Sequence, residues 1–392
     1  MSAGATALDP FVPHYSAGEM ARRLDLARDI ARGRDLDALV VYGAGRFALD
    51  LYWLSDWPGG REGLAIVPAE GEPALLVQFF NHVPQARRMC AWEDVRWAGA
   101  GSVDGVLGLL RSLGPGGRPL RLGIAGGLPH RVAFAMAGRP GGAELVEVSG
   151  ALATARAVKS AEELARIRMA AALTDRSLDA LYDALVPGAR ERDLVRALED
   201  TYLAAGGYTG IHFLSSMPMD APTAWVPSQY PSERQIAVGD VVVGEYTGCY
   251  WGASGQIHRT FSLGRPPDDA WRRLHDAGVE AYEAVAGALR EGATAADVVA
   301  AADVIAARGY GTCDDLLHGV DQLPPVLRTR QAAHGPQDLD FVFRADMVVT
   351  IQPNPVHPVL PMGLQQGETV RITSTGVERL HTLSPEWRVR RV

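Results

Sequence analysis

Two runs of apolar and β-branched residues joined by a glycine-containing turn constrain the fold of this chain more than any other feature. They extend from Val241 to Phe261, and the turn falls within Gly248–Gly252. Two such runs with a turn between them predict a β-hairpin or meander. The strand signal returns in the tail, at Met347–Gln352 and Glu368–Thr373. The C-terminal part is therefore expected to contain a largely antiparallel sheet.

Helical patterns come before and between these strands. Ser160 and Glu163 form a capping box at the start of a strong helix that runs to about Leu185. The other helices expected in this part cover about 190–205, 268–290 and 295–309. Helices followed by antiparallel strands predict an α+β domain.

A chain of 392 residues is too long for one ordinary core, and we place two domains at 1–155 and 156–392. The first domain alternates strands and helices, which is typical of a small α/β fold. Its expected helices cover about 16–34, 103–113 and 130–137, and its expected strands cover about 37–42, 63–67, 74–77 and 120–124. The segment 144–156 is expected to be the hinge.

Composition excludes several classes of protein. The net charge is −8 and no basic run is present, which argues against a nucleic-acid partner. The longest apolar runs fall far short of a membrane span, and the first residues lack the pattern of a signal peptide. Three widely spaced cysteines, Cys90, Cys249 and Cys313, fit a reducing compartment. We therefore expect a cytoplasmic protein that acts on a small molecule.

Four short segments in a fixed order carry a family resemblance. They are Gly239–Tyr246, Gly255–Phe261, Leu317–Gly319 and Met347–Pro353, the last of which is followed by Gly363–Thr373. Their order and spacing resemble the creatinase, Xaa-Pro dipeptidase and aminopeptidase P superfamily. The resemblance implies a pita-bread catalytic domain from about residue 155 to the end. The segment Tyr52–Asp56 is similar to part of the smaller N-terminal domain of that superfamily.

Peptidases of this superfamily bind two divalent metal ions through Asp, Asp, His, Glu and Glu side chains. Two ions that share a water molecule generate hydroxide near neutral pH. The resemblance places the five ligand positions at Glu245, Gln256, His318, Gln352 and Gly367. Three of them have lost the anionic oxygen, although a shift of one residue would bring Glu368 to the last position. We therefore expect no metal and no cofactor.

Creatinase, a member of the superfamily that lacks metal, hydrolyses a C–N bond with polar side chains around a histidine. This chain departs from creatinase as well. His258 lies two residues beyond the second aspartate position, where creatinase has a glutamate, and Gln352 replaces a glutamate that creatinase keeps.

The residues that remain suggest catalytic roles. His318 is the expected general base and acid, because imidazole titrates near neutral pH. Glu245 would orient His318 or bind a cationic nitrogen, and His258 is a second candidate acid or base. The expected substrate-binding residues offer amides, a guanidinium, aromatic rings or a carboxylate: Gln256, Gln352, Arg259, Trp225, Tyr246, Trp251 and Glu368.

Other interpretations of single residues remain open. A structural ion pair between Glu245 and Arg259 competes with a role for either residue in the site. His318 lies before a glycine and would also serve to brace a tight turn. Asp314 is expected on a solvated face or at a helix cap, and Asn354 is expected either to turn inward or to shape its loop.

Three functions follow. The first is a metal-independent, creatinase-like hydrolase that cleaves a C–N bond of a small polar molecule, or catalyses a related cyclisation or elimination. The second is a non-catalytic binding protein. The third is a metal-dependent Xaa-Pro peptidase with an unusual site. The resemblance also implies a homodimer, in which Trp53, Trp57 and the loop Gly59–Arg61 would lie near the site of the partner.

Overall fold

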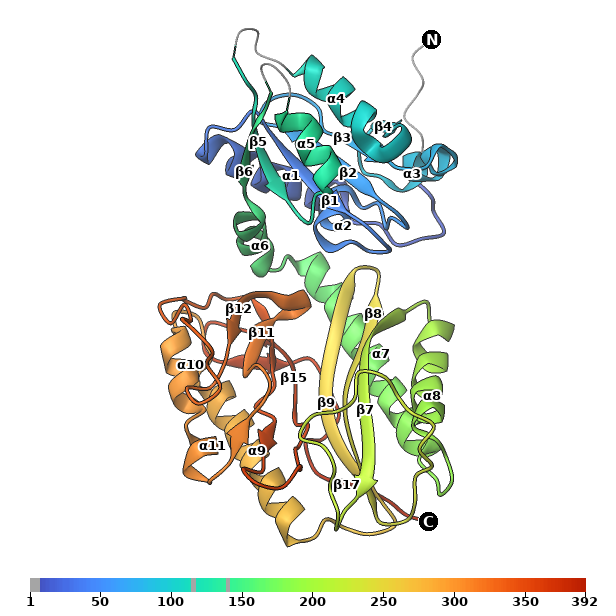
Figure 1. Cartoon of the computed structure of the whole chain (residues 1–392), viewed down its shortest axis with the longest axis vertical. Coiled ribbons are helices and arrows are strands. Elements are labelled where there is room, and N and C mark those ends of the chain that lie inside the picture. Colours follow the sequence, from blue (N-terminus) through green and yellow to red (C-terminus); the bar gives the residue numbers. More distant parts are fainter. Residues whose placement is uncertain (1–7, 114–117, 139–141) are drawn as a thin grey trace. The chain divides into compact units, whose positions relative to one another are not determined.

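The computed structural model describes residues 8–113, 118–138 and 142–392. The chain divides into two compact units, Met1–Arg156 and Ala157–Val392 (Figure 1). Each unit has a sheet with helices packed against it.

The N-terminal unit is built on a six-stranded sheet with the strand order β4-β3-β2-β1-β5-β6. The strands are β1 (Ala38–Gly43), β2 (Gly63–Pro68), β3 (Ala74–Val77), β4 (Asp94–Trp97), β5 (Arg121–Ala125) and β6 (Glu144–Glu147). β2 runs antiparallel to β1 and β3, whereas the other neighbours are parallel. Parallel neighbours require crossover helices, and the predicted α/β alternation supplies them.

The described residues of this unit form six α-helices: α1 (Ala17–Gly33), α2 (Leu49–Ser55), α3 (Val83–Met89), α4 (Val103–Ser112), α5 (His130–Ala137) and α6 (Ser149–Ala157). Most of the helices and strands expected from the sequence form within one or two residues of their predicted bounds. The expected hinge at 144–156 is wrong, because β6 and α6 occupy it. The segment that forms β6 has too few apolar positions for the sequence to reveal a strand at the edge of the sheet.

The C-terminal unit contains a nine-stranded sheet. Its main path runs β12-β11-β13-β15-β9-β8-β7, with β16 paired to β15 and β17 paired to β9. The bounds are β7 (Tyr208–Pro218), β8 (Asp240–Tyr250), β9 (Ala253–Leu263), β11 (Leu317–Gly319), β12 (Leu323–Leu327), β13 (Val348–Ile351), β15 (Gly367–Ile372), β16 (Val377–Arg379) and β17 (Arg388–Arg390). A short separate pair joins β10 (Gly311–Thr312) to β14 (Pro355–Val356).

Five helices cover this sheet: α7 (Ala161–Ala184), α8 (Glu191–Ala204), α9 (Asp269–Ala288), α10 (Ala295–Ala301) and α11 (Val304–Ala307). Figure 1 shows α7 and α8 beside β7, β8 and β9, and the other three on the side of β11, β12 and β15. The predicted capping box is confirmed, because Ser160 and Glu163 bond each other's backbone N–H. The α+β architecture predicted from the sequence is confirmed.

Three details of this unit differ from expectation. The helix expected at 295–309 is two shorter helices, α10 and α11. The long strand β7 was not expected. His318 lies in the strand β11 rather than in a turn, and it pairs directly with Thr350 of β13. A three-residue strand is too short to show an alternating pattern in the sequence.

Among the described residues, no helix has both the length and the apolar character needed to cross a membrane.

Candidate active site

The register of three neighbouring strands brings Glu245, Gln256 and His258 to one face of the sheet. Glu245 of β8 lies directly opposite His258 of β9, and His258 in turn lies opposite Gly367 of β15. Directly paired residues of antiparallel strands project to the same face. Gln256 shares this face because it is two residues before His258.

His318 and Gln352 reach the same face from the other half of the sheet. His318 lies opposite Thr350, which lies opposite Thr369, two residues beyond Gly367. Gln352 follows Thr350 by two residues at the end of β13. The five polar residues on this face are named the polar cluster: Glu245, Gln256, His258, His318 and Gln352.

Three other predicted substrate-binding residues lie on the opposite face. Tyr246 and Arg259 are neighbours of cluster residues in their strands, so alternation turns them away. Glu368 lies opposite Ile257 and is also turned away. Its carboxylate is bound by Nη2 of Arg259 at 2.6 Å, by Arg379 and by the hydroxyl of Tyr282 at 3.1 Å. The structure therefore does not bring Glu368 to the last ligand position.

The two predicted tryptophans also lie outside the polar cluster. Trp225 is 42% exposed, and its indole N–H donates to the carbonyl oxygen of His357 at 3.0 Å. Trp251 occupies the turn between β8 and β9, five residues from Gln256. Five residues of strand correspond to about 16 Å.

Glu245 is the one carboxylate of the polar cluster. The amide nitrogen of Gln256 donates to its Oε1. Burial raises the pKa of Glu245 to about 7, and the nearby charge of Asp314 acts in the same direction, while the Gln256 hydrogen bond opposes them. The alternative of an ion pair between Glu245 and Arg259 is not realised, because Arg259 binds Glu368 instead. Glu245 therefore changes protonation state close to neutral pH.

His318 is held by its own strand. Its Nδ1 lies 2.8 Å from the carbonyl oxygen of Gly319, and the side chain is 4% exposed. A carbonyl oxygen only accepts, so Nδ1 carries the proton and Nε2 presents a lone pair. His318 is thus fixed in the tautomer that a general base requires.

His258 is completely buried, and burial lowers the pKa of its imidazole to about 3. It is therefore neutral at physiological pH, and its ring nitrogen is a weaker base than that of an exposed histidine. Its Nδ1 lies 2.7 Å from Oε1 of Gln365. Its Nε2 has no hydrogen-bond partner among the residues that the structure describes.

Three residues near His258 were not predicted as site residues. Gln365, Asn354 and Asp314 form hydrogen bonds with one another behind the imidazole. The expected role of Asp314 on a solvated face or at a helix cap is wrong: its carboxylate accepts from two buried amides, and burial raises its pKa. Gln365 lies before the start of β15, so strand alternation gives no signal for it in the sequence.

Gln352 is buried, and its amide nitrogen donates to the carbonyl oxygen of Asp315 at 3.0 Å. Its Oε1 has no partner within the described part of the chain. A buried amide oxygen without a partner costs about 1–3 kcal/mol, which a ligand that donates a hydrogen bond would recover.

The polar cluster does not fit a pair of divalent metal ions. Its donors are one carboxylate, two neutral amides and two imidazoles, whereas such a pair needs several anionic oxygens to balance its charge. No group of three His, Cys, Asp or Glu side chains in the described ranges is arranged to hold a metal ion. At the last ligand position, a Cβ on Gly367 would lie 2.0 Å from the carbonyl oxygen of Ile351. The backbone thus leaves no room for a ligand side chain there.

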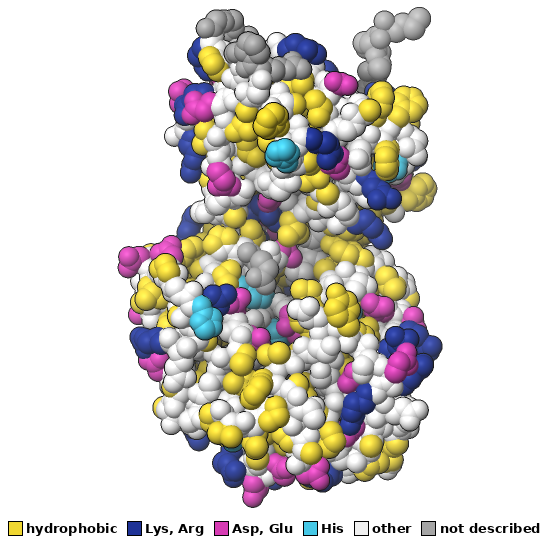
Figure 2. Space-filling view, viewed as in Figure 1, with side chains coloured by type: hydrophobic (Ala, Val, Ile, Leu, Met, Phe, Trp, Pro, Cys, Tyr) yellow, Lys and Arg dark blue, Asp and Glu magenta, His cyan; other side chains and the backbone are white. Residues whose placement is uncertain are grey.

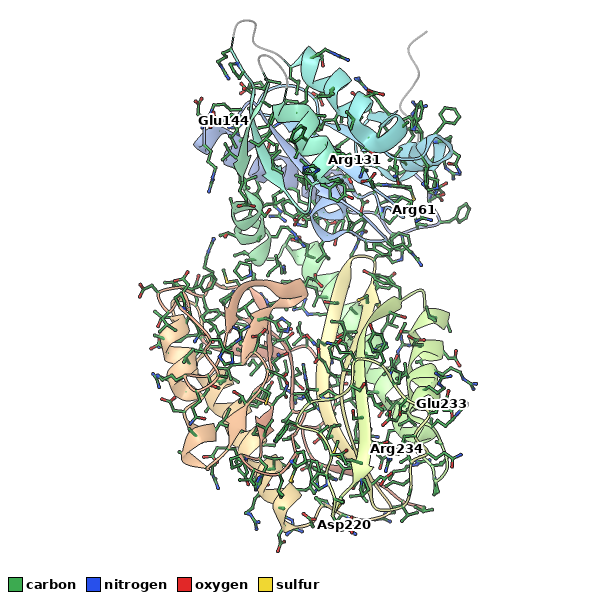
Figure 3. All side chains as sticks on the ribbon, in the orientation of Figure 1. Arg61, Arg131, Glu144, Asp220, Glu233 and Arg234 are labelled. Atoms are coloured by element: carbon green, nitrogen blue, oxygen red, sulfur yellow. The ribbon has the colours of Figure 1, made fainter. Side chains whose placement is uncertain are left out.

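Figure 2 shows a hollow on the visible face of the C-terminal unit, with histidine and acidic side chains inside it. The charged residues labelled on this unit in Figure 3, Asp220, Glu233 and Arg234, lie toward its periphery. Acidic side chains therefore occur both in the hollow and on the outer surface of this unit.

Comparisons with known proteins agree with this architecture. Residues 165–377 match metallopeptidase family M24, and residues 23–158 match the creatinase/prolidase N-terminal domain. The Xaa-Pro dipeptidase of Pyrococcus furiosus is 26% identical over 262 residues, which cover 66% of this chain and 73% of that protein. An uncharacterized hydrolase/peptidase of Sinorhizobium fredii is 33% identical over 158 residues, or 40% of each chain.

Solved structures share the fold over nearly the whole chain. A prolidase from Thermococcus sibiricus superposes with a TM-score of 0.81 at 19% identity, covering 96% of this chain and 100% of that one. A dipeptidase from Mycobacterium ulcerans gives a TM-score of 0.79 at 23% identity, covering 97% and 100%. The fold is thus the pita-bread fold with its smaller N-terminal domain, and the chain belongs to metallopeptidase family M24.

Proposed function

We propose that the protein is a metal-independent hydrolase that cleaves a C–N bond of a small polar nitrogen-containing molecule. The observation that carries this proposal is the tautomer of His318. The hydrogen bond from Nδ1 to Gly319 leaves the Nε2 lone pair available within a cluster that lacks the anionic donors of a metal pair.

In the proposed reaction His318 acts first as a base and then as an acid. Its Nε2 takes a proton from a water molecule while the water oxygen forms a bond to the electrophilic carbon. The C–N bond then breaks, and the same proton passes from Nε2 to the leaving nitrogen. The products are the hydroxylated carbon fragment and the released amine, whose new N–H carries the proton taken from water, so atoms and charge balance without a further reactant.

Glu245 supports this chemistry through its charge. With a pKa of about 7, it is present in both forms near neutral pH. Its ionised form would stabilise the positive charge that develops on His318 or on a substrate nitrogen. The same residues also suit a cyclisation or an elimination, because each of these reactions requires a base that removes a proton and an acid that donates one.

The decisive variant is His318→Ala. The purified enzyme would be screened against ureas, amidines, amides and Xaa-Pro dipeptides, with release of ammonia or amine as the signal. We expect turnover of at least one class in the wild type and its loss in His318→Ala. His334→Ala, a change at an exposed histidine of the same unit, should keep full activity. Full activity in a folded His318→Ala protein would overturn the proposal.

Metal independence is tested separately. We expect elemental analysis to find no stoichiometric Mn, Fe, Co or Zn, and activity to survive EDTA. Stoichiometric metal together with chelator-sensitive cleavage of Xaa-Pro dipeptides would instead establish a metal-dependent peptidase with an unusual site.

A second candidate is a binding protein without catalysis. Two buried acceptors without partners, Nε2 of His258 and Oε1 of Gln352, favour it, because they provide for ligand recognition whether or not a reaction follows. Ligand binding without turnover across the whole screen would select this function.

We further propose a cytoplasmic homodimer. All three cysteines are free, which fits a reducing compartment. Trp53 and Trp57 are 5% and 7% exposed, so in a dimer they would support the contact from beneath the surface, and their nearness to a partner's site stays a prediction. Arg61, labelled in Figure 3, is exposed and remains a candidate for that contact. Light scattering after size-exclusion chromatography should give a mass of two chains, and a monomer would contradict this.

A further inference from the structure

A continuous set of hydrogen bonds lies behind His258. It begins at the backbone, where N–H of Gln366 donates to Oδ1 of Asn354 at 3.0 Å. This bond fixes the orientation of the Asn354 amide, so Nδ2 faces the other way. Nδ2 donates to Oδ2 of Asp314 at 3.1 Å and to Oε1 of Gln365 at 3.0 Å.

The same reasoning determines the orientation of the Gln365 amide and then the tautomer of His258. Nε2 of Gln365 lies 3.3 Å from the Asp314 carboxylate, which accepts the hydrogen bond, so Oε1 must face the imidazole. Nδ1 of His258 lies 2.7 Å from that oxygen and 3.5 Å from Nδ2 of Asn354. The two N–H groups of Asn354 are directed to Asp314 and Gln365 at shorter distances, so Nδ1 carries the proton and donates it to Gln365. The remaining nitrogen, Nε2, presents a bare lone pair, is buried, and has no partner in the described residues.

The other amides of the polar cluster are oriented in the same way. Gln352 directs its N–H group to the carbonyl oxygen of Asp315 and leaves Oε1 without a partner. Gln256 directs its N–H group to Glu245. His318 directs its single N–H to Gly319. Each of these side chains thus has an N–H group bonded to the protein, whereas two acceptor atoms, Nε2 of His258 and Oε1 of Gln352, have no partner among the described residues.

We propose that Asp314, Asn354 and Gln365 are positioning residues that hold His258 with its proton on Nδ1, and that the resulting array of acceptors selects a ligand with a planar, N–H-rich nitrogen group. This inference deepens the proposed function and rests on it only in taking the polar cluster as the substrate site.

The ligand class follows from the unpartnered atoms. Buried acceptors without partners cost free energy that only a hydrogen-bond donor recovers. An amidinium-type group offers several N–H donors in one plane together with a positive charge that the Glu245 carboxylate would bind. A carboxylate of the same shape would place lone pairs against Nε2 of His258 and Oε1 of Gln352.

The first test compares two probes of nearly equal size and shape, acetamidinium and acetate, by calorimetric titration of the full chain. We expect acetamidinium to bind at least tenfold more tightly. Tetramethylammonium, which has the charge but no N–H group, should bind as weakly as acetate. Acetate binding as tightly as acetamidinium, or tetramethylammonium matching it, would overturn the inference.

The second test reads the tautomer directly. Nitrogen-15 NMR of labelled histidine side chains in the wild-type chain should show His258 neutral, with the proton on Nδ1. A proton on Nε2 would overturn the inference without any need for a variant. Gln365→Met should release the tautomer and reduce the preference for acetamidinium. Asp314→Asn should keep both the His258 tautomer and the preference for acetamidinium, because the asparagine oxygen still accepts a hydrogen bond from Gln365.

These outcomes are distinct from those for the proposed function. Selective acetamidinium binding with no turnover of any substrate would leave this inference standing while removing the hydrolase. Turnover that depends on His318, with no preference for N–H-rich probes, would support the hydrolase and overturn this inference.

Discussion

Glu368 and Arg259 form a buried ion pair, with 2.6 Å between Oε2 and Nη2, on the face of the sheet that is turned away from the polar cluster. Their side chains are 1% and 3% exposed. Burial alone would raise the pKa of Glu368, but hydrogen bonds from Arg379 and the charge of Arg259 outweigh it and hold the pKa below its ordinary value. This carboxylate therefore stabilises the fold rather than serving a metal or a substrate.

Glu368→Gln should destabilise the C-terminal unit strongly. The change leaves the Arg259 guanidinium buried without its counter-charge, which costs about 3–5 kcal/mol. Urea denaturation followed by circular dichroism measures the loss. The matched control is Asp200→Asn, which breaks an exposed pair with Arg196 and should cost less than about 0.5 kcal/mol. Equal effects of the two changes would contradict the structural role of Glu368.

Gly367→Ala should be severely destabilising, although it adds only a methyl group. The new Cβ would lie 2.0 Å from the carbonyl oxygen of Ile351 and 3.0 Å from the Cα of Gln352. Relief of this overlap requires a backbone shift, at a cost of about 1–3 kcal/mol or more. Thermal unfolding would show the loss as a lower midpoint.

The control for this change is Gly287→Ala, which lies in α9 and meets no atom within 4 Å. It should be neutral or stabilise the unit by up to about 1 kcal/mol, because alanine favours a helix over glycine. A tolerated Gly367→Ala would mean that the close approach of β13 and β15 is not present in solution.

Glu245→Gln should raise stability at alkaline pH. The pKa of Glu245 is raised from 4.5 to about 7, so the folded protein binds this proton more tightly than the unfolded chain does. The stabilisation is fully present below pH 4.5 and is lost as the pH rises through 7. Glutamine does not titrate, so the variant should gain about 1–3 kcal/mol relative to the wild type between pH 5 and pH 8. A difference between the two proteins that stays constant over this range would contradict the raised pKa.

Periodic patterns made much of the fold predictable. The capping box at Ser160 and Glu163 marked the start of α7, and the β-branched runs marked β8 and β9. The capping box and the β-branched runs can be recognised because each involves residues that are close together in the sequence. The strands β6 and β11 were missed because their positions depend on pairing with segments distant in sequence, such as Thr350 for His318.

The candidate site was predictable in its location but not in its full membership. Gln256, His258 and Glu245 were expected together, and the register of β8 and β9 brings them together. Strand alternation alone would have excluded Tyr246 and Arg259, which adjoin residues of the cluster. The position of Glu368 could not be settled in this way, because it depends on the pairing of β15 with β9.

Asp314, Asn354 and Gln365 had no recognisable pattern in the sequence. Asp314 and Asn354 lie in irregular segments, and Asn354 adopts a positive φ of 34°. Hydrogen bonds across 40 and 51 residues of chain connect Asp314 to the other two. Relations of this kind arise only from the folded backbone.

The turn between β8 and β9 consists of Trp251 and Gly252, both with positive φ, and Tyr250 pairs directly with Ala253 across it. Two such residues match the tight hairpin turns whose twist suits the flanking strands. Because side chains alternate along each strand, a slip of one residue would turn Glu245 or both Gln256 and His258 to the other face. The length of this two-residue turn therefore sets the register of β8 and β9, and with it the face on which the cluster residues lie. Substitutions within the turn would change the stability of the hairpin, whereas a single inserted or deleted residue would separate the members of the polar cluster.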